Sequence, residues 1–416
     1  MSQEHRLLSR LVWSPLVSTF GRRRALRGKE AAAAVDMKPS PMAVFCPEDP
    51  SEISIVLESA RAAKAPMICL GTGSRITPDL RVRLPKQGYA IIDLKGLSGI
   101  DELNSDSLWI SVLAGTPMKT VVAAARKHDL RLAGTEAEEG TVGGWLSASA
   151  GIDDCILGVH QSPILSIEAV LATGNLVHSV SAPRAATGPD PFSLLLGTWG
   201  GFGIITRATL KLEPLPERKL IAGFSFSSLS KAIDFIKVIV TRFLPPRRAT
   251  LFIDGQSSKR KARVVVAYEG QQQINRAGQK FAFSQAEIFS GQPAEHGKAR
   301  QWLTSDPFKD RKFFSSGIAW SKLAGFLRAV DAQLGGFDKA VIDHPGLTGC
   351  LLRVAPGNSE TTPRHEDWDN LVDPDNSLRN ALDSSRSWLI RVRSQLDPDG
   401  LINPHAWPPP WPGGEC

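Results

Sequence analysis

The sequence predicts an α+β protein of two or three domains, and three observations carry this prediction. The chain has 416 residues, more than one hydrophobic core normally encloses. From about residue 42, short apolar runs alternate with amphipathic segments of helical period. Two prolines, Pro214 and Pro216, then interrupt this alternation and predict a domain boundary.

The composition argues against several functional classes. The chain is 42% hydrophobic and 22% charged with a formal net charge of +7, which suits an anionic small ligand or partner better than a nucleic acid. The five cysteines never form a C-x-x-C pair, and they indicate a reducing compartment rather than a disulfide framework or a metal centre. No apolar run approaches the roughly 20 residues that span a bilayer. We therefore expect a cytoplasmic protein without a metal site.

Residues 1–39 are expected to form a basic N-terminal arm. Arg10 and Pro15 break its apolar stretch, which makes it a poor secretory signal. Two interpretations stay open: a helix packed over the first domain, or a segment that docks on a partner subunit or on an anionic membrane surface. The residues behind both interpretations are an apolar set and a basic cluster, namely Leu11, Trp13, Leu16, Arg22, Arg23 and Arg24.

Residues 40–217 predict a first domain of alternating strands and helices. Apolar side chains recur at helical spacing in residues 49–65 behind Asp49 or Ser51, which predicts a capped helix. Residues 190–203 predict the start of a further helix, and the turn at Gly174 and Asn175 predicts a β-hairpin. The other expected elements are a helix over 117–130 and strands within 41–48, 66–71, 89–94, 108–115, 164–174, 175–181 and 204–217.

Residues 218–385 predict a second, smaller α+β domain with weaker signals and many polar loops. Residues 386–416 predict a helix followed by a proline-rich end. The sequence shows no internal repeat and no low-complexity segment.

The stretch GTVGGWLSASAG, from Gly140 to Gly151, gathers the smallest residues of the chain. Such a block predicts either a ligand laid against the main chain or two elements packed unusually closely. Two further glycine turns, GTGSRI from Gly71 and GGFGII from Gly200, could present main-chain N–H groups to a diphosphate. Neither fits the Rossmann or P-loop fingerprint, so neither turn is specific by itself.

Other catalytic motifs find no support. The eight histidines form no H-x-x-H or H-E-x-x-H pair, which argues against metal-dependent hydrolysis. The chain also has no G-x-S-x-G elbow, which removes the usual argument for a serine hydrolase.

Read together and in order, the glycine segments are far more specific. GTGS, GTVGGWLSASAG, ILSIEAVLATGNLV and LLLGTWGGFGIITRATLKLEP resemble the FAD-binding domain of the vanillyl-alcohol oxidase/PCMH flavoprotein superfamily. The closing LDPDGLINP resembles the segment with which many members return to that domain. Within the superfamily, the chain is most similar to the FAD-binding (E-type) subunit of glycolate oxidase. The sequence departs from the family at Cys69-Leu70, where Pro-Arg is common, and at Trp199, where glutamate is common.

The resemblance implies an α+β fold in which a PCMH-type FAD-binding domain of two α/β subdomains is joined to a smaller α+β cap domain. It implies FAD held without a covalent link, because the first glycine turn contains no histidine or cysteine. The implied contacts are a diphosphate turn, a wall along the flavin chain with two residues behind it, and a closing strand. In that order they comprise Gly71, Thr72, Gly73 and Ser74; Thr141, Val142, Gly143 and Gly144 with Ala148 and Gly151; and Gly203, Ile204 and Ile205.

The function implied is oxidation of a small 2-hydroxy acid such as glycolate or lactate, within a larger complex and with possible peripheral attachment to the inner face of a membrane. Two alternatives stay open: a non-catalytic FAD-carrying subunit of a glycolate oxidase complex, and an NADPH-dependent reductase of the UDP-MurNAc type. A substrate carboxylate needs a cation and its hydroxyl needs a base. The candidates in the second region are Arg311, Lys312, His344 and Arg353.

Overall fold

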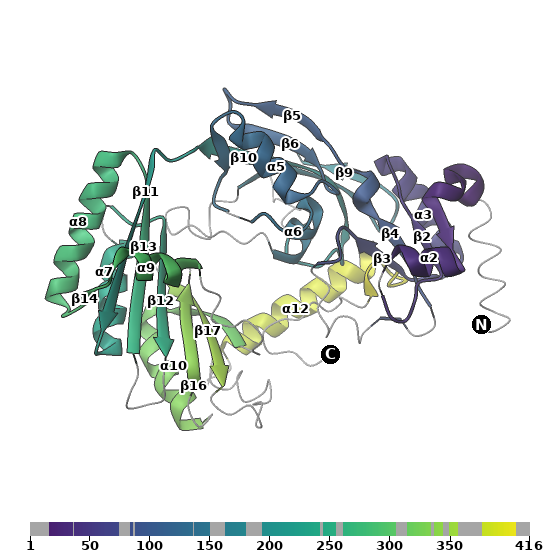
Figure 1. The fold of residues 1–416 in the computed structure, drawn as a ribbon. Coiled ribbons are helices and arrows are strands. Elements are labelled where there is room, and N and C mark those ends of the chain that lie inside the picture. Colours follow the sequence, from purple (N-terminus) through teal and green to yellow (C-terminus); the bar gives the residue numbers. More distant parts are fainter. Residues whose placement is uncertain are drawn as a thin grey trace. The chain divides into compact units, whose positions relative to one another are not determined.

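The structure, a computed structural model, divides into two compact units. Unit 1 comprises Met1–Gly151, Pro163–Pro214 and Ser384–Pro410, and unit 2 comprises the remaining residues, chiefly Leu215–Asp383. The residues described are 16–35, 37–74, 84–85, 88–135, 137–149, 163–179, 194–241, 244–254, 261–304, 314–333, 337–343, 349–356 and 377–404. Figure 1 shows the elements of each unit.

The first sheet of unit 1 has the strand order β1-β2-β4-β3. Strands β2 (Ala43–Phe45), β4 (Ala90–Asp93) and β3 (Met67–Leu70) run parallel, and β1 (Ala25–Arg27) pairs antiparallel with β2. All four residues of β4 are buried, as a central parallel strand covered on both faces requires.

Helix α3 (Pro50–Ala62) connects β2 to β3 and begins where the sequence predicts. The Asp49 side chain caps it by accepting a hydrogen bond from the Ser51 N–H, and Pro50 occupies the first turn, where no N–H is needed. Its buried face is the predicted apolar stripe, namely Ile53, Val56, Leu57 and Ala60.

The second sheet of unit 1 is antiparallel and is built around one long strand, β10 (Gly203–Pro214). Strand β10 pairs with β6, with β8 and, near its end, with the short β7. Strands β8 and β9 form the predicted hairpin. The strand bounds are β5 Ile100–Asn104, β6 Trp109–Leu113, β7 Leu130–Leu132, β8 Ile164–Leu171 and β9 Leu176–His178.

Two helices accompany this sheet, α5 (Met118–Arg126) and α6 (Val142–Ser149). Helix α6 is formed by the small-residue block itself. The prediction that a helix starts within residues 190–203 is wrong for the described residues 194–202. These residues form a short 3₁₀ segment and turns. Gly197, Trp199 and Gly200 all have left-handed φ values, of +68°, +55° and +72°, which an α-helix does not accommodate.

The described N-terminal residues pack into unit 1. Residues 16–24 are helical, and the side chains of Leu16 and Phe20 are 1% and 4% exposed in the same core as Phe45. Arg24 donates two hydrogen bonds to the Glu52 carboxylate of α3, at 2.8 and 2.9 Å. Helix α2 (Gly28–Ala34) follows β1.

Unit 2 is a seven-stranded sheet with helices on both faces, in the order β14-β11-β13-β12-β16-β17-β15. Its strands are β11 Arg218–Phe226, β12 Arg248–Asp254, β13 Lys261–Gly270, β14 Gln292–Pro293, β15 Phe314–Ala319, β16 Phe337–Asp343 and β17 Gly349–Pro356. Its helices are α7 Leu229–Thr241, α8 Gln272–Ile288, α9 His296–Thr304 and α10 Trp320–Gln333.

One face of the unit 2 sheet packs on α7, α8 and α10 in the larger of the unit's two hydrophobic clusters. Phe224 and Phe235 are fully buried in this cluster with ring centroids 5.2 Å apart, edge to face. The other face carries a smaller cluster with Trp302 and Leu303 of α9.

Helix α12 (Ser377–Leu396) leads into the closing segment of the chain. From Ser384 onward it belongs to unit 1, and Ile402 pairs in parallel with Met67 of β3. Among the described helices, none is both long and apolar enough to cross a membrane.

Candidate functional site

A cleft lies within unit 1 and is lined by glycine main chain, by apolar side chains and by Asn403. Its walls come from the end of β3, from α6, from the turn before β10 and from the closing segment. Six of the predicted cofactor residues line it: Gly71, Gly143, Gly144, Gly203, Ile204 and Ile205. Cys69, Leu94, Ser147, Trp199, Gly200 and Asn403 complete the lining.

The structure brings the first two glycine segments into contact, although about 70 residues separate them. A Cβ atom added to Gly71 would fall on the Thr141 hydroxyl and within 2.9 Å of its methyl carbon. A Cβ added to Gly140 would lie 3.2 Å from the Ser74 hydroxyl. The Thr72 and Ser74 hydroxyl oxygens are themselves 3.0 Å apart. The turn after β3 and the start of α6 therefore form one edge of the cleft.

Left-handed backbone conformation explains why two positions beside the cleft are glycine. Gly73 and Gly140 have φ values of +73° and +80°, a region that side chains with a Cβ rarely occupy. In this conformation a turn can aim successive N–H groups toward an anion. The geometry of residues 71–74 thus suits a diphosphate.

The first N–H groups of α6 already have protein partners. Val142 N–H donates to the Thr116 carbonyl at 3.0 Å, and Gly143 N–H donates to the Ala114 carbonyl at 2.8 Å. Gly144 N–H donates to the Thr141 hydroxyl at 3.2 Å, a side-chain cap. Helix α6 can therefore favour an anion through its dipole, while direct N–H bonds to an anion must come from the turn.

Tight packing explains why position 143 is glycine. A Cβ on Gly143 would lie 2.9 Å from the Ala114 Cβ and 3.2 Å from the Ala114 carbonyl oxygen. A Cβ added to Gly144 would lie 3.1 Å from the Thr141 hydroxyl oxygen, and Gly144 lines the cleft. At Gly143 the small-residue block thus allows close packing, and the neighbouring Gly144 leaves the cleft open.

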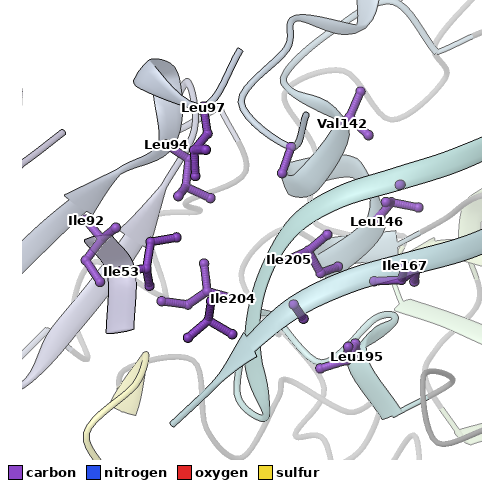
Figure 2. Packing of buried hydrophobic residues seen from close by; sticks show 14 of the residues in the cluster. Ile53, Ile92, Leu94, Leu97, Val142, Leu146, Ile167, Leu195, Ile204 and Ile205 are labelled. Atoms are coloured by element: carbon purple, nitrogen blue, oxygen red, sulfur yellow. The ribbon is translucent and has the colours of Figure 1, made fainter. Parts of the chain in front are cut away.

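Apolar side chains line part of the cleft, and Figure 2 shows three of them, Leu94, Ile204 and Ile205, within the buried core. Ile204 and Ile205 of β10 line it and are 2% and 4% exposed. Leu94, at the end of β4, lines it as well. Figure 2 shows Val142 and Leu146 of α6 among the buried side chains of this core, so Val142 contributes to packing.

The third glycine turn rests on the second half of α6. Gly197 N–H donates to the Leu146 carbonyl at 3.1 Å, and Trp199 N–H donates to the Ser147 carbonyl at 2.7 Å. Trp199 is held in left-handed backbone, an uncommon state for a large side chain. The turn is thereby fixed at the cleft wall.

Asn403 is a cleft residue that sequence reasoning missed. Its side-chain oxygen accepts a hydrogen bond from the Cys69 N–H at 2.7 Å, and its amide nitrogen donates to the carbonyls of Trp199 and Gly200 at 3.1 and 3.3 Å. The only signal was the resemblance of LDPDGLINP to a returning segment, which gave no role to a particular side chain.

A buried ion pair holds the closing segment. Arg393 is 5% exposed and donates to the carbonyls of Gly201 and Ile402, each at 2.7 Å, and to the Asp397 carboxylate at 3.2 Å. Asp397 also accepts from the N–H groups of Leu401 and Ile402. Burial lowers the pKa of Arg393, and the Asp397 charge opposes that shift.

The remaining predicted residues fall elsewhere. Ala148 is half-buried on α6 and does not line the cleft, and Thr141 is buried behind the first turn. Gly151, Arg311, Lys312 and His344 lie outside the described residues. Arg353 lies in unit 2 on β17, in register with Ser315 of β15 and Val341 of β16.

The described lining contains no Asp, Glu, Lys, Arg or His side chain. Its one titratable side chain is Cys69, and burial raises the pKa of that thiol. Among the described residues, no group of three His, Cys, Asp or Glu side chains is placed to hold a metal. A ligand in this part of the cleft would meet neutral groups.

The comparison with protein families indicates the cofactor of this region. Residues 41–179 match the FAD binding domain family. This region is an FAD-binding domain. It contains the first two glycine segments, and the left-handed turn at residues 71–74, with no Cβ at Gly71, fits an extended dinucleotide that approaches the main chain.

The relatives in sequence are distant and longer. A probable mitochondrial D-lactate dehydrogenase of Danio rerio is 26% identical over 52% of this chain and 44% of its own length. Glycolate oxidase subunit GlcD of Bacillus subtilis is 26% identical over 51% and 46%, and alkyldihydroxyacetonephosphate synthase of Caenorhabditis elegans is 24% identical over 53% and 38%. The matches thus span less than half the length of these relatives.

Solved structures show the same fold. A 4-ethylphenol oxidase from Gulosibacter chungangensis superposes with a TM-score of 0.72 at 15% identity, covering 97% of both chains. A p-cresol methylhydroxylase gives a TM-score of 0.70 at 14% identity over 97% of both chains, and an alkyldihydroxyacetonephosphate synthase gives 0.71 at 15%. The α+β, PCMH-type fold predicted from the sequence is confirmed.

Proposed function

We propose that this chain is an FAD-dependent oxidoreductase that oxidises a small 2-hydroxy acid of the glycolate or lactate type. The observation that carries the proposal is the convergence of three glycine segments on one neutral cleft within a unit that contains an FAD-binding domain. The sequence relatives named D-lactate dehydrogenase and glycolate oxidase subunit support this substrate class.

The described residues would bind and orient the cofactor. The turn at residues 71–74 would offer main-chain N–H groups and two hydroxyls to the diphosphate, and the positive end of the α6 dipole would favour its charge. Ile204 and Ile205 would keep water from one side of the cleft. FAD, when bound, supplies a two-electron acceptor.

Oxidation of a 2-hydroxy acid removes a hydride from the α-carbon and a proton from the hydroxyl group, and it leaves a 2-oxo acid. The hydride requires the flavin and the proton requires a base. The described lining of the cleft supplies neither the base nor the carboxylate-binding cation. Our candidates remain Arg311, Lys312, His344 and Arg353, with arginine favoured because its guanidinium binds a carboxylate through two hydrogen bonds.

Anaerobic titration of the purified FAD-loaded protein tests this function. We expect glycolate or D-lactate to bleach the flavin absorbance with one equivalent of 2-oxo acid formed per flavin reduced. FAD-loaded protein whose absorbance neither acid changes would contradict the substrate class. Reduction by NADPH in place of the acids would instead identify a reductase.

The alternative is an FAD-carrying subunit that has no activity alone. It is favoured by the printed name of one relative, a glycolate oxidase subunit, and by the partial length of the match. Titration after mixing with co-expressed partner chains separates the two functions. Bleaching only in the presence of a partner identifies the subunit role. We also propose that this complex associates peripherally with a membrane.

A further inference from the structure

We propose that Asn403 is a positioning residue for FAD: its side chain ties the end of β3 to the third glycine turn and so sets the width of the flavin cleft. The proposal rests on FAD binding by the domain and is independent of which substrate is oxidised. Cys69 and Asn403 are 334 residues apart in sequence, so the closing segment completes a site that begins near the start of the chain.

The first step is the main-chain placement of the closing segment. Met67 N–H donates to the Leu401 carbonyl, and Asn403 N–H donates to the Met67 carbonyl, each at 2.8 Å. Residues 401–403 therefore run beside β3 in the manner of an added parallel strand. This places Asn403 beside Cys69, two residues before Gly71.

The second step is the side chain. Asn403 has a φ of +44°, a left-handed conformation that asparagine tolerates better than most residues. Its amide group reaches both walls at once, with the oxygen on the Cys69 N–H and the nitrogen on the Trp199 and Gly200 carbonyls. One planar group thus fixes the separation of the first and third turns.

The third step is the close contact between the Asn403 side chain and the third glycine turn. A Cβ added to Gly200 would fall on the Asn403 amide nitrogen, so the turn lies directly against this side chain. The buried pair of Arg393 and Asp397 fixes the segment from behind, because Arg393 also binds the Gly201 carbonyl of the same turn. Loss of the Asn403 side chain would leave one N–H and two carbonyls without this partner at the cleft wall, where each costs free energy.

Two variants test the proposal. Asn403→Gly removes the side chain but keeps a residue that adopts left-handed backbone without a steric penalty. Asn403→Asp is nearly isosteric and keeps the acceptor for the Cys69 N–H but removes both N–H donors. Asp399→Asn is the matched control, since it lies on the same segment with its side chain 47% exposed and 4.0 Å from Arg61.

The measurement is the FAD dissociation rate, followed as the rise of flavin fluorescence on dilution, beside the thermal midpoint of each apoprotein. We expect both Asn403 variants to release FAD at least about tenfold faster than the parent protein, and the control to match the parent. The bound flavin spectrum of both variants should also shift toward that of free FAD. A mere stability role would lower the apoprotein midpoint and leave the rate and spectrum unchanged.

Parent-like release from Asn403→Asp would overturn the proposal, because the bonds to the third turn would then contribute nothing. Parent-like release from Asn403→Gly would overturn it equally. A parent protein that takes up no FAD would instead show that the cofactor assignment has failed, which this parallel measurement distinguishes.

Discussion

At the scale of single residues, the glycines in and beside the cleft are required for two different physical reasons. Gly73 and Gly140 supply left-handed backbone. Gly71 and Gly143 supply room, because a Cβ at either position would meet Thr141 or Ala114. The two reasons predict different consequences of substitution, and they can be separated by experiment.

Gly73→Ala should weaken FAD binding by distorting the diphosphate turn. No described atom lies within 4 Å of the added Cβ, so the cost is conformational, about 1–2 kcal/mol. Gly21→Ala is a matched control, with a φ of +70° and equally open surroundings in the N-terminal segment. We expect similar losses in thermal midpoint for both variants but a higher FAD dissociation constant for Gly73→Ala alone. Equal FAD affinity in the two variants would remove residues 71–74 from the site.

Gly143→Val should destabilise the apoprotein itself. The added side chain would press on Ala114, and overpacking of this kind costs about 1–3 kcal/mol. Chemical denaturation of the apoprotein measures this loss directly. FAD retention should fall as well, because Gly143 lines the cleft. A variant as stable as the parent would show that α6 and the segment at Ala114 are less closely packed than the structure indicates.

At the scale of elements, local signals predicted the regular structure well. The capped helix α3, the buried strand β3 and the β8–β9 hairpin follow from periodicity and turn chemistry within short windows. The helix start expected within residues 190–203 is wrong for residues 194–202, which lead into the third glycine turn and form a 3₁₀ segment and turns. The conformation of that turn is set by bonds to α6 and to Asn403, which no local window contains.

The cap of α3 gives a pH-dependent prediction. The hydrogen bond from the Ser51 hydroxyl, followed by that from the Ser51 N–H, holds the pKa of the Asp49 carboxyl below its usual value. A carboxyl with a depressed pKa in the folded state stabilises the fold above its unfolded pKa, and this stability is lost as pH falls through the folded value. Asp49→Ala should therefore cost about 0.5–1 kcal/mol of unfolding free energy at pH 7, at the low end for a cap because Asp49 is exposed.

Urea denaturation of the parent and of Asp49→Ala across pH tests the cap. The difference in unfolding free energy between them should be constant near neutral pH and should shrink as pH falls below about 5, where an ordinary aspartate begins to protonate. Asp106→Ala, on the exposed turn between β5 and β6, is a control that should show no such difference. A gap that persists at low pH would assign the cost of Asp49→Ala to helix propensity or packing instead.

At the scale of the whole molecule, the sequence was sufficient for the cofactor domain and insufficient for the catalytic groups. Glycine blocks can be recognised in a sequence because only glycine readily allows a positive φ and a close approach of the main chain to another group. A sequence does not distinguish catalytic arginines and histidines from those on solvated surfaces, and the described lining of the cleft contains neither residue type. The sequence also did not predict the roles of Asn403 and Arg393. Their hydrogen-bond partners in the cleft walls, at Cys69 and Gly201, lie roughly 330 and 190 residues away in the chain.

The N-terminal segment provides the last prediction, because its two interpretations differ in their effect on the whole fold. Leu16 and Phe20 are buried in the core of unit 1, β1 pairs with β2, and Arg24 binds Glu52. Deletion of residues 1–30 should therefore lower the thermal midpoint and expose the edge of β2, whereas deletion of residues 1–15 should preserve both fold and FAD binding. Co-sedimentation with anionic vesicles at low and high salt, run on the shorter deletion, measures what the first 15 residues do. Vesicle binding that the parent shows at low salt and this deletion loses would identify them as a membrane-docking segment, and unchanged partitioning would leave packing as the role of the N-terminus.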